Sequence, residues 1–405
     1  MIGRVLISLL AFALAASAAP PDPPGHWVGT WACAPQLAEP ANCPPAPGLA
    51  GSTLREIVRA SIGGRKVRLR LSNAFGDAAV SLASVHLADS AGGGEIRRGS
   101  DRALAFGGAP AVTIPPGRAV TSDASDFDLA PLSDVAITIQ FRNAPRGVTA
   151  HPGSRTTSFL QRGDFVSAPA LPDPARIDHW YFIEGVDVFA EDASAGAVVI
   201  LGDSITDGRG STTNGNDRWP DLLARRVQAD PAMPRVAVLN EGIGGNCLIR
   251  GGLGPTALAR FDRDVLAQAG ARWLIVFEGV NDIGGSVAAR ASSERPSIAS
   301  DIIEAYKLFT SRAHARGLRV AGATITAFGG FSRYFTPESE AARQQINHWI
   351  RTSGKFDAVI DFDAATRDPG DPSRLAAGYD CGDHLHLNPA GYDRMARAVD
   401  LRLFR

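Results

Sequence analysis

The sequence has almost no net charge and no long apolar run in its interior. Its 41 Lys and Arg residues are balanced by 42 Asp and Glu residues, so the formal net charge is -1 at pH 7. A chain without a large net charge has no strong long-range electrostatic attraction to nucleic acid or to an anionic membrane. After Ala16, no stretch approaches the roughly 20 apolar residues of a transmembrane helix. The sequence therefore predicts no nucleic-acid partner and no stable membrane insertion, and it favours a small or neutral ligand.

The N-terminus has the pattern of an export signal. Arg4 precedes the apolar run Val5–Ala16, and Ala16-Ser17-Ala18 resembles an A-x-A cleavage site. We expect a signal peptide over residues 1–18, cleaved near Ala18, and a Pro-rich leader over residues 19–26. The mature protein is expected to be secreted or periplasmic.

Cysteine is scarce, with only Cys33, Cys43, Cys247 and Cys381. In an oxidising compartment an even number indicates two disulfides, and four cysteines allow three pairings. A bond between Cys33 and Cys43 would close a short Pro-rich loop, which leaves Cys247 with Cys381. The alternative is four free, buried thiols.

Residues 27–190 lack any convincing helical period. Short alternating or β-branched runs are separated there by Gly, Pro, Asn and Asp, which is typical of an all-β sandwich or jelly roll. The clearest runs are Leu54–Ala60, Val67–Leu71, Val80–Leu87, Val135–Phe141 and Tyr181–Val188.

Residues 191–196 are a polar linker, and the patterning changes after it. Over residues 197–405, apolar runs alternate with segments of helical spacing, which predicts a parallel sheet with helices on both faces. The expected strands are at 197–201, 236–239, 273–277, 318–323 and 358–360, and the expected helices lie near 218–229, 255–269, 298–316, 337–353 and 389–402.

The first of these strands runs directly into Gly202-Asp203-Ser204. In open α/β sheets, ligands bind beyond the carboxyl ends of the strands. A serine at such an end, with Gly202 and Gly208 on either side, is a candidate nucleophile. The alternative is that Asp203 and Ser204 only cap a helix.

Two further polar segments follow expected strands. Asn240–Asn246 contains three glycines, including Gly245, and glycines expose backbone N–H groups. Glu278–Asp282 contains Asn281, whose amide would donate to a developing oxyanion. The alternatives are an ordinary loop and an Asx turn.

The last loop places Asp383 three residues before His386. This carboxylate would fix the histidine tautomer and leave the other ring nitrogen free to take a proton from Ser204. The competing interpretation is a metal site made from Asp380, Asp383, His384 and His386. No His-x-x-x-His or Cys-x-x-Cys pattern supports it, so we predict neither a metal nor an organic cofactor.

These four segments together resemble the SGNH, or GDSL, hydrolase superfamily in order and approximate spacing. The resemblance covers about residues 195–405 and implies a flavodoxin-like three-layer α/β/α domain. It implies an esterase with Ser204 as nucleophile, His386 as base, Asp383 as its partner, and Ser204, Gly245 and Asn281 as oxyanion donors. His384 does not match the family position. The chain has no Gly-x-Ser-x-Gly, which argues against the α/β-hydrolase elbow.

The segments Asp207–Thr212 and Asn216–Pro220 are similar to arylesterases and acylhydrolases associated with xylan degradation. With no long apolar lid, we expect short acyl groups, especially acetyl, on carbohydrate. The alternatives are a lipase- or lysophospholipase-like acylhydrolase, and a carbohydrate-binding protein with an inactive or secondary hydrolase half. In the latter case, an aromatic platform for sugar would consist of Trp27, Trp31 and Trp180. Tryptophans in small β-domains more often belong to the core, so we favour a third interpretation, in which the β-rich part is a scaffold that shapes the rim of the active site.

Substrate contacts are predicted from residue type alone. Arg209, Arg218 and Trp219 would bind a polar leaving group, and Phe328 would line the acyl or sugar pocket. The aromatic loop Ala327–Phe335 would equally serve to anchor itself. Two residues of the β-rich region, Asn73 and Arg155, are polar and lie near turns or strand ends, where they would face the cleft.

Overall fold

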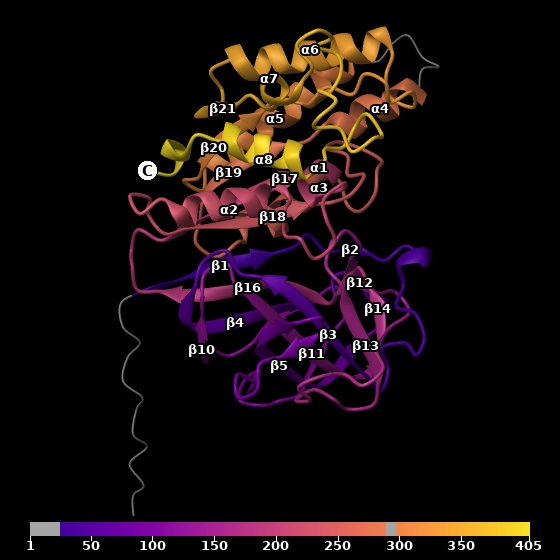
Figure 1. Cartoon of the computed structure of the whole chain (residues 1–405), viewed down its shortest axis with the longest axis vertical. Coiled ribbons are helices and arrows are strands. Elements are labelled where there is room, and N and C mark those ends of the chain that lie inside the picture. The colour runs from indigo at the N-terminus through magenta and orange to yellow at the C-terminus, as the bar shows by residue number, and fades with distance from the viewer. Residues whose placement is uncertain (1–24, 289–296) are drawn as a thin grey trace, which may run out of the picture.

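Short β-branched runs form antiparallel sheets in the first half of the chain, and longer alternating units form a parallel sheet in the second. The computed structural model describes residues 25–288 and 297–405. The expected signal peptide and most of the Pro-rich leader lie outside these residues. Figure 1 shows the β-rich part below and the parallel sheet with its helices above.

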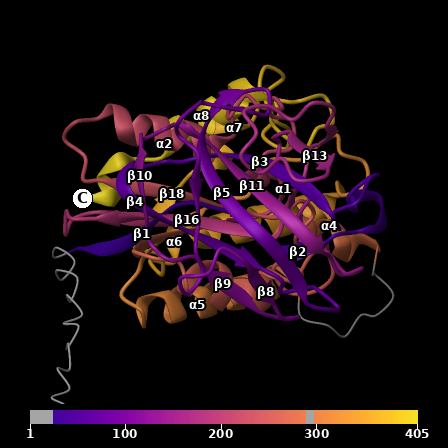
Figure 2. The same cartoon turned by 90° about the horizontal axis from the view of Figure 1, so that it is seen from below.

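The β-rich part contains three antiparallel sheets. Their orders are β1-β16-β4-β10 with β9 beside β4, β14-β13-β3-β11-β5-β6 with β7 and β8 beside β5, and β15-β12-β2. The strands are β1 His26–Ala32, β2 Gln36–Leu37, β3 Ser52–Arg59, β4 Gly64–Ser72, β5 Val80–Gly92, β6 Glu95–Ile96, β7 Arg102–Ala103, β8 Val112–Ile114, β9 Ala119–Thr121, β10 Ser125–Leu129, β11 Asp134–Asn143, β12 Thr149–His151, β13 Ser158–Arg162, β14 Ala175–Ile177, β15 Trp180–Tyr181 and β16 Ile183–Ala190. Figure 2 shows β5, β11 and β3 crossing the face of this part that points away from the helices.

Alternation along β4 explains how these strands build a core. Val67, Leu69 and Leu71 are fully buried. Arg68 and Arg70 point to the opposite face, where both form ion pairs with the buried Asp187. The period of two therefore separates an apolar interior from a charged face on one strand.

The second part contains a parallel sheet in the order β18-β17-β19-β20-β21. In β17, Val198 and Ile200 face one apolar core with α2 and α8, whereas Val199 and Leu201 face another core with α5 and α6. Helices therefore cover both faces, and the expected α/β architecture is confirmed at this level. The strands are β17 Gly196–Gly202, β18 Val236–Gly242, β19 Ala271–Phe277, β20 Arg319–Ala323 and β21 Ala358–Ile360.

The five predicted helical segments form helices with small differences in their bounds, and three further helices, α1, α4 and α7, were not among them. They are α1 Ser204–Asp207, α2 Trp219–Ala229, α3 Ala257–Phe261, α4 Val280–Ala288, α5 Ile298–His314, α6 Pro337–Thr352, α7 Phe362–Thr366 and α8 Pro389–Ala398. The segment expected near 255–269 begins as α3 after the Thr256 cap and continues as one π-turn over Asp262–Leu266. None of the helices in the described ranges is both long and apolar enough to cross a bilayer.

The two parts share one hydrophobic core. Strand β1 packs against β18, and the N–H of Gly29 donates to the carbonyl of Ala269 at 2.9 Å. Arg70 donates to the side chain of Gln268 at 2.6 Å across the same boundary. The cluster that contains Leu69 continues without interruption to Leu239 in β18. The β-rich part is therefore packed directly against the parallel sheet.

The cysteines correct the sequence-based expectation. All four are free thiols, so neither predicted disulfide is present. The Cys33 thiol follows β1 into the core and donates to the carbonyl of Ile183, whereas Cys43 is exposed. Burial raises the pKa of the Cys33 thiol well above its ordinary value. Cys247 is buried and Cys381 is exposed, so the alternative of four buried thiols is also only half correct.

Candidate active site

Ser204 is the first residue of α1, directly beyond the carboxyl end of β17. The Asp203 side chain caps this helix by accepting from the N–H of Ile205 at 2.9 Å. Gly208 ends the helix after one turn with φ of 102°. A Cβ on Gly202 would collide with Thr206, so the sharp entry into the turn requires glycine. Helix capping and presentation of Ser204 are thus two functions of the same turn.

Ser204, His386 and Asp383 lie in one chain of hydrogen bonds. The distance from Ser204 Oγ to His386 Nε2 is 2.7 Å, and the distance from His386 Nδ1 to Asp383 Oδ2 is also 2.7 Å. The backbone N–H of His386 donates to the other Asp383 oxygen at 2.8 Å. Burial opposes ionisation of Asp383, but these bonds prevail and lower its pKa well below the ordinary value. The carboxylate therefore stays charged and holds the imidazole with Nε2 toward Ser204.

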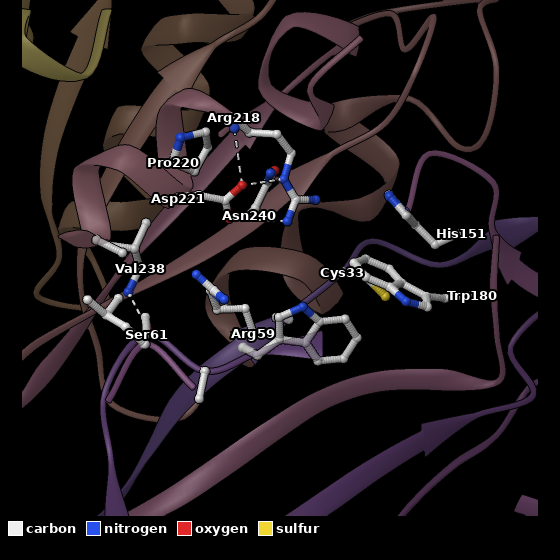
Figure 3. A pocket seen from close by; sticks show the side chains of 15 residues that line it. Cys33, Arg59, Ser61, His151, Trp180, Arg218, Pro220, Asp221, Val238 and Asn240 are labelled. Atoms are coloured by element: carbon white, nitrogen blue, oxygen red, sulfur yellow. Dashed lines mark hydrogen bonds and ion pairs between the residues drawn. The ribbon is translucent and has the colours of Figure 1, made fainter. Parts of the chain in front are cut away.

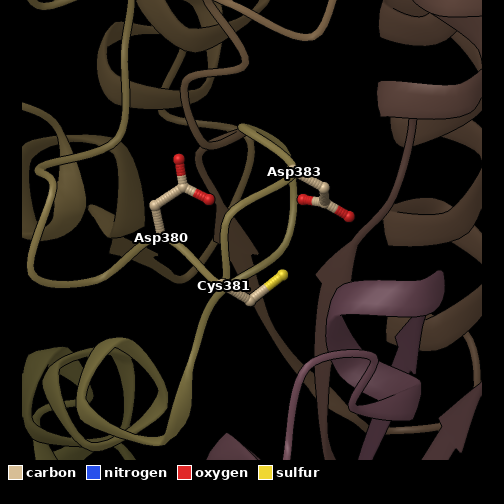
Figure 4. Close-up of side chains that lie close together, drawn as sticks. All are labelled: Asp380, Cys381 and Asp383. Atoms are coloured by element: carbon tan, nitrogen blue, oxygen red, sulfur yellow. The ribbon is translucent and has the colours of Figure 1, made fainter.

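His384 is directed away from this chain. Its Nδ1 pairs with Asp380 at 2.6 Å, and its side chain is 49% exposed. Figure 4 shows Asp380, Cys381 and Asp383, whose ligand atoms lie within 4.8 Å of one another. Both carboxylates already accept hydrogen bonds from backbone N–H groups and from a histidine ring. These groups act as hydrogen-bond acceptors that shape the loop.

Three groups are candidate oxyanion donors, namely the N–H groups of Ser204 and Gly245 and the amide of Asn281. The N–H of Ser204 belongs to the first turn of a helix, where no preceding carbonyl is available. Gly245 has φ of 70°, and its N–H meets no acceptor within the described part of the chain. The Asn281 amide uses one N–H on the carbonyl of Asn246 at 2.8 Å, which leaves its second N–H free.

Tyr334 fixes the orientation of this amide. Its hydroxyl donates to Asn281 Oδ1 at 3.0 Å, so the oxygen is engaged and the NH₂ group points the other way. A side chain at Gly284, one turn along α4, would collide with the Tyr334 ring. Tyr334 belongs to the aromatic loop that the sequence singled out, but nothing in that pattern revealed its contact with Asn281.

Buried carboxylates lie behind the nucleophile turn. Burial, reinforced by Asp282 and Asp207, raises the pKa of Asp203 to about 7. Burial also raises the pKa of Asp282 to about 6 and that of Glu278 well above its ordinary value. The cluster is therefore protonated more readily than exposed carboxyl groups are.

One fully buried arginine joins the strand ends that carry these motifs. Arg260 donates to the carbonyls of Gly202 at 3.0 Å and Glu241 at 2.6 Å. It also donates to the side chain of Asn246 at 3.0 Å and to Glu278 at 3.3 Å. No sequence pattern indicated this role, because Arg260 lies on a helix outside every motif.

The four predicted substrate contacts have different outcomes. Arg209 is 62% exposed, and its Nε lies 4.0 Å from Asp383 Oδ2, beside the candidate triad. Arg218 is buried at the N-cap position of α2, where its backbone N–H and its guanidinium both donate to the Asp221 carboxylate. Trp219 and Phe328 are fully buried in apolar cores. Of the four side chains, only that of Arg209 is thus largely exposed, and the substrate contacts of the other three stay predictions.

The aromatic platform that the carbohydrate-binding alternative requires is not assembled in the β-rich part. Trp31 and Trp180 are buried and pack edge to face with ring centroids 5.0 Å apart. Trp27 is half-buried under the guanidinium of Arg68. Asn73 is fully buried and donates to two backbone carbonyls. Arg155 reaches the second part of the chain instead, where it contacts Asp207.

Comparison with known proteins identifies the second part. Residues 200–394 match the GDSL-like lipase/acylhydrolase family. No curated protein sequence matches the chain. Similar solved structures include an acetyl xylan esterase from Geobacillus stearothermophilus, 20% identical with a TM-score of 0.41, covering 52% of this chain and 96% of that one. A GDSL-like lipase from Bacteroides thetaiotaomicron VPI-5482 is 18% identical with a TM-score of 0.38, covering 51% of this chain and 87% of that one. The family resemblance inferred from the four motifs is confirmed.

Proposed function

Because residues 200–394 form a GDSL-like lipase/acylhydrolase domain, we propose that this protein is a secreted serine esterase that removes short acyl groups, especially acetyl, from carbohydrate. The observation that carries the proposal is the pair of 2.7 Å contacts that join Ser204, His386 and Asp383. A nucleophile, a base and an orienting carboxylate in this geometry are the requirements for acyl transfer through a covalent intermediate.

The proposed reaction has two steps. His386 Nε2 takes the proton of Ser204 as Oγ attacks the ester carbonyl. The oxyanion is held by the N–H groups of Ser204 and Gly245 and by the Asn281 amide. Collapse breaks the bond to the alcohol, which leaves with the proton from His386. Water, deprotonated by His386, then attacks the acyl carbonyl. The bond to Ser204 Oγ breaks, His386 returns the proton to Oγ, and the acid is released.

An apolar side chain beside Gly245 supports an acyl-binding surface at this loop. Leu253 is 50% exposed, and its side chain lies next to Gly245, so the candidate oxyanion loop has a small apolar neighbour. The exposed Arg209, whose Nε lies 4.0 Å from Asp383 Oδ2, fits a polar alcohol such as a sugar. No comparable observation favours the lipase-like alternative, and the burial of Trp31 and Trp180 opposes the carbohydrate-binding one.

The proposal is tested with p-nitrophenyl esters of increasing chain length beside acetylated xylan. We expect kcat/KM to be highest for acetate and acetate to be released from the polysaccharide. Ser204→Ala should abolish both activities while circular dichroism stays unchanged. Turnover retained by Ser204→Ala would refute the serine mechanism, and a preference for long acyl chains would favour the lipase-like alternative.

Export is tested separately on the protein expressed with its full N-terminus. The Arg4, Val5–Ala16 and Ala18 pattern supports cleavage near Ala18. N-terminal sequencing of protein recovered from the periplasm or medium is expected to begin close to residue 19. Intact protein confined to the cytoplasm would contradict this part of the proposal.

A further inference from the structure

A second histidine–carboxylate pair lies beside the nucleophile turn. His151, the last residue of β12, contributes its Nε2 to Asp207 Oδ1 at 3.0 Å. Asp207 is the last residue of α1, three positions after Ser204, and its side chain is 1% exposed. The pair therefore joins the β-rich part to the turn that presents the proposed nucleophile.

The hydrogen bonds of His151 define where protons lie. Its Nδ1 contacts the carbonyl of Ala34 at 2.9 Å, and a carbonyl only accepts, so Nδ1 carries a proton. The bond from Nε2 to Asp207 then contains a second proton, on the imidazole or on the carboxyl group. The ring is also stacked on Trp180, with centroids 5.7 Å apart. Figure 3 shows His151 and Trp180 at the wall of a cavity of about 30 Å³ between the two parts.

Arg155 binds the other oxygen of the same carboxylate. Its Nη2 lies 3.3 Å from Asp207 Oδ2. A Cβ on Gly153 would collide with the Asp207 carboxylate, so the backbone between His151 and Arg155 packs directly against that carboxylate. A buried carboxylate without such partners is strongly destabilised. Donors from the β-rich part thus hold Asp207 in place from two directions.

Asp207 in turn contacts the backbone that carries two proposed oxyanion donors. Its own N–H donates to the carbonyl of Asp203 at 2.8 Å, which closes the turn of Ser204. A Cβ on Gly244 would lie 3.3 Å from Asp207 Oδ2, in the loop next to Gly245. A shift of Asp207 therefore displaces both the nucleophile turn and the Gly245 loop.

The same segment of the β-rich part supports the loop that follows α1. Asn214 donates its N–H to the carbonyl of Arg155 at 2.9 Å, and Thr157 donates its N–H to Asn214 Oδ1 at 2.8 Å. Residues 151–157 therefore contact the chain on both sides of Gly208.

We propose that His151 and Arg155 are positioning residues for the reaction: through Asp207 they fix the turn that presents Ser204, so the β-rich part completes the active site. This inference rests on the proposed function. It assigns the β-rich part a role in catalytic geometry in place of carbohydrate binding.

The test compares two substitutions of His151 in the full chain. Glutamine places an amide N–H near the position of Nε2 and keeps a donor for Asp207, whereas asparagine places it near Nδ1 and loses that bond. His151→Asn is expected to lower kcat for p-nitrophenyl acetate about 10- to 100-fold with KM little changed, because misplacing a reacting group slows chemistry. His151→Gln should remain within about fivefold of the wild type, since one hydrogen bond is retained. Inactivation by a fluorophosphonate should slow in parallel with kcat.

The matched control is His86, which pairs with Asp101 at the same 3.0 Å inside the β-rich part, away from Ser204. His86→Asn should leave kcat unchanged. The inference would be overturned by equal kcat values in the two His151 variants or by a rise in KM without a fall in kcat. It would also be overturned if kcat fell as far in His86→Asn as in His151→Asn. If His151→Asn does not fold, Arg155→Ala and Arg155→Lys decide: kcat must fall at least about threefold in the first and recover in the second.

Failure of this inference is distinguishable from failure of the proposed function. Wild-type kinetics in His151→Asn, together with an inactive Ser204→Ala protein, would overturn the positioning role and leave the esterase proposal standing. Activity retained by Ser204→Ala would overturn both.

Discussion

Two histidine–aspartate pairs lie beside Ser204, and they differ in burial and in origin. The Asp383–His386 pair is local, three residues apart, and the Asp383 side chain is 32% exposed. The His151–Asp207 pair joins residues 56 positions apart, and both side chains are almost fully buried. A pair that exchanges protons with substrate must reach the surface, whereas a pair that maintains geometry is best enclosed.

The largest expected effect separates the two pairs. His386→Ala should lower kcat by about 10⁴- to 10⁶-fold, because Ser204 loses its base. Its melting temperature should fall less than that of His151→Ala, since within the described residues the His386 hydrogen bonds join it to its own loop and to Ser204, not to the β-rich part. Ester hydrolysis and thermal unfolding of both variants provide the measurement. A larger stability loss in His386→Ala would reverse the distinction between the pairs.

The next effect concerns Asn281, one of the three proposed oxyanion donors. Asn281→Ala should lower kcat by on the order of 10²- to 10³-fold with KM little altered, because its free N–H meets negative charge only in the transition state. Steady-state kinetics on p-nitrophenyl acetate measures this. A rise in KM at constant kcat would mean that Asn281 binds the ground state instead.

The third effect concerns the contribution of the buried Asp203 carboxyl group to the free energy of unfolding. Asp203 is buried and its pKa is raised to about 7. A carboxyl group whose pKa is raised on folding contributes stability at low pH and loses it as pH rises, here between about 4 and 7. Asp203→Asn keeps an acceptor for the helix cap and removes the buried charge. It should therefore raise the unfolding free energy at pH 8 by on the order of 2–4 kcal/mol.

The pH dependence is the internal control for Asp203→Asn. Differential scanning calorimetry should show a melting temperature above that of the wild type at pH 8, and a smaller difference at pH 5. A difference that is constant with pH would show that the gain arises from packing. The exposed Asp400, which pairs with Arg402, serves as a comparison, and Asp400→Asn should not raise the melting temperature at pH 8.

The same contrast explains what the sequence could predict. Strands were predictable because β-branched runs such as Val198–Leu201 have a short-range signature. Ser204 and the Asp383–His386 pair were predictable because each motif is local. The His151–Asp207 pair was not, because it exists only after the two parts pack together. The burial of Arg218, Trp219 and Phe328 was not predictable for a related reason, since residue type does not reveal which side of a helix or loop becomes buried.

The smallest expected effect tests another contact that the sequence did not reveal. Tyr334→Phe removes one hydroxyl, which donates to Asn281 Oδ1 at 3.0 Å, and leaves the ring in place. Loss of one orienting hydrogen bond should lower kcat about 3- to 10-fold. Because the hydroxyl acts through Asn281, Tyr334→Phe should have no further effect when combined with Asn281→Ala. Additive losses in that double variant would mean that Tyr334 contacts the substrate directly, as His386 is proposed to do.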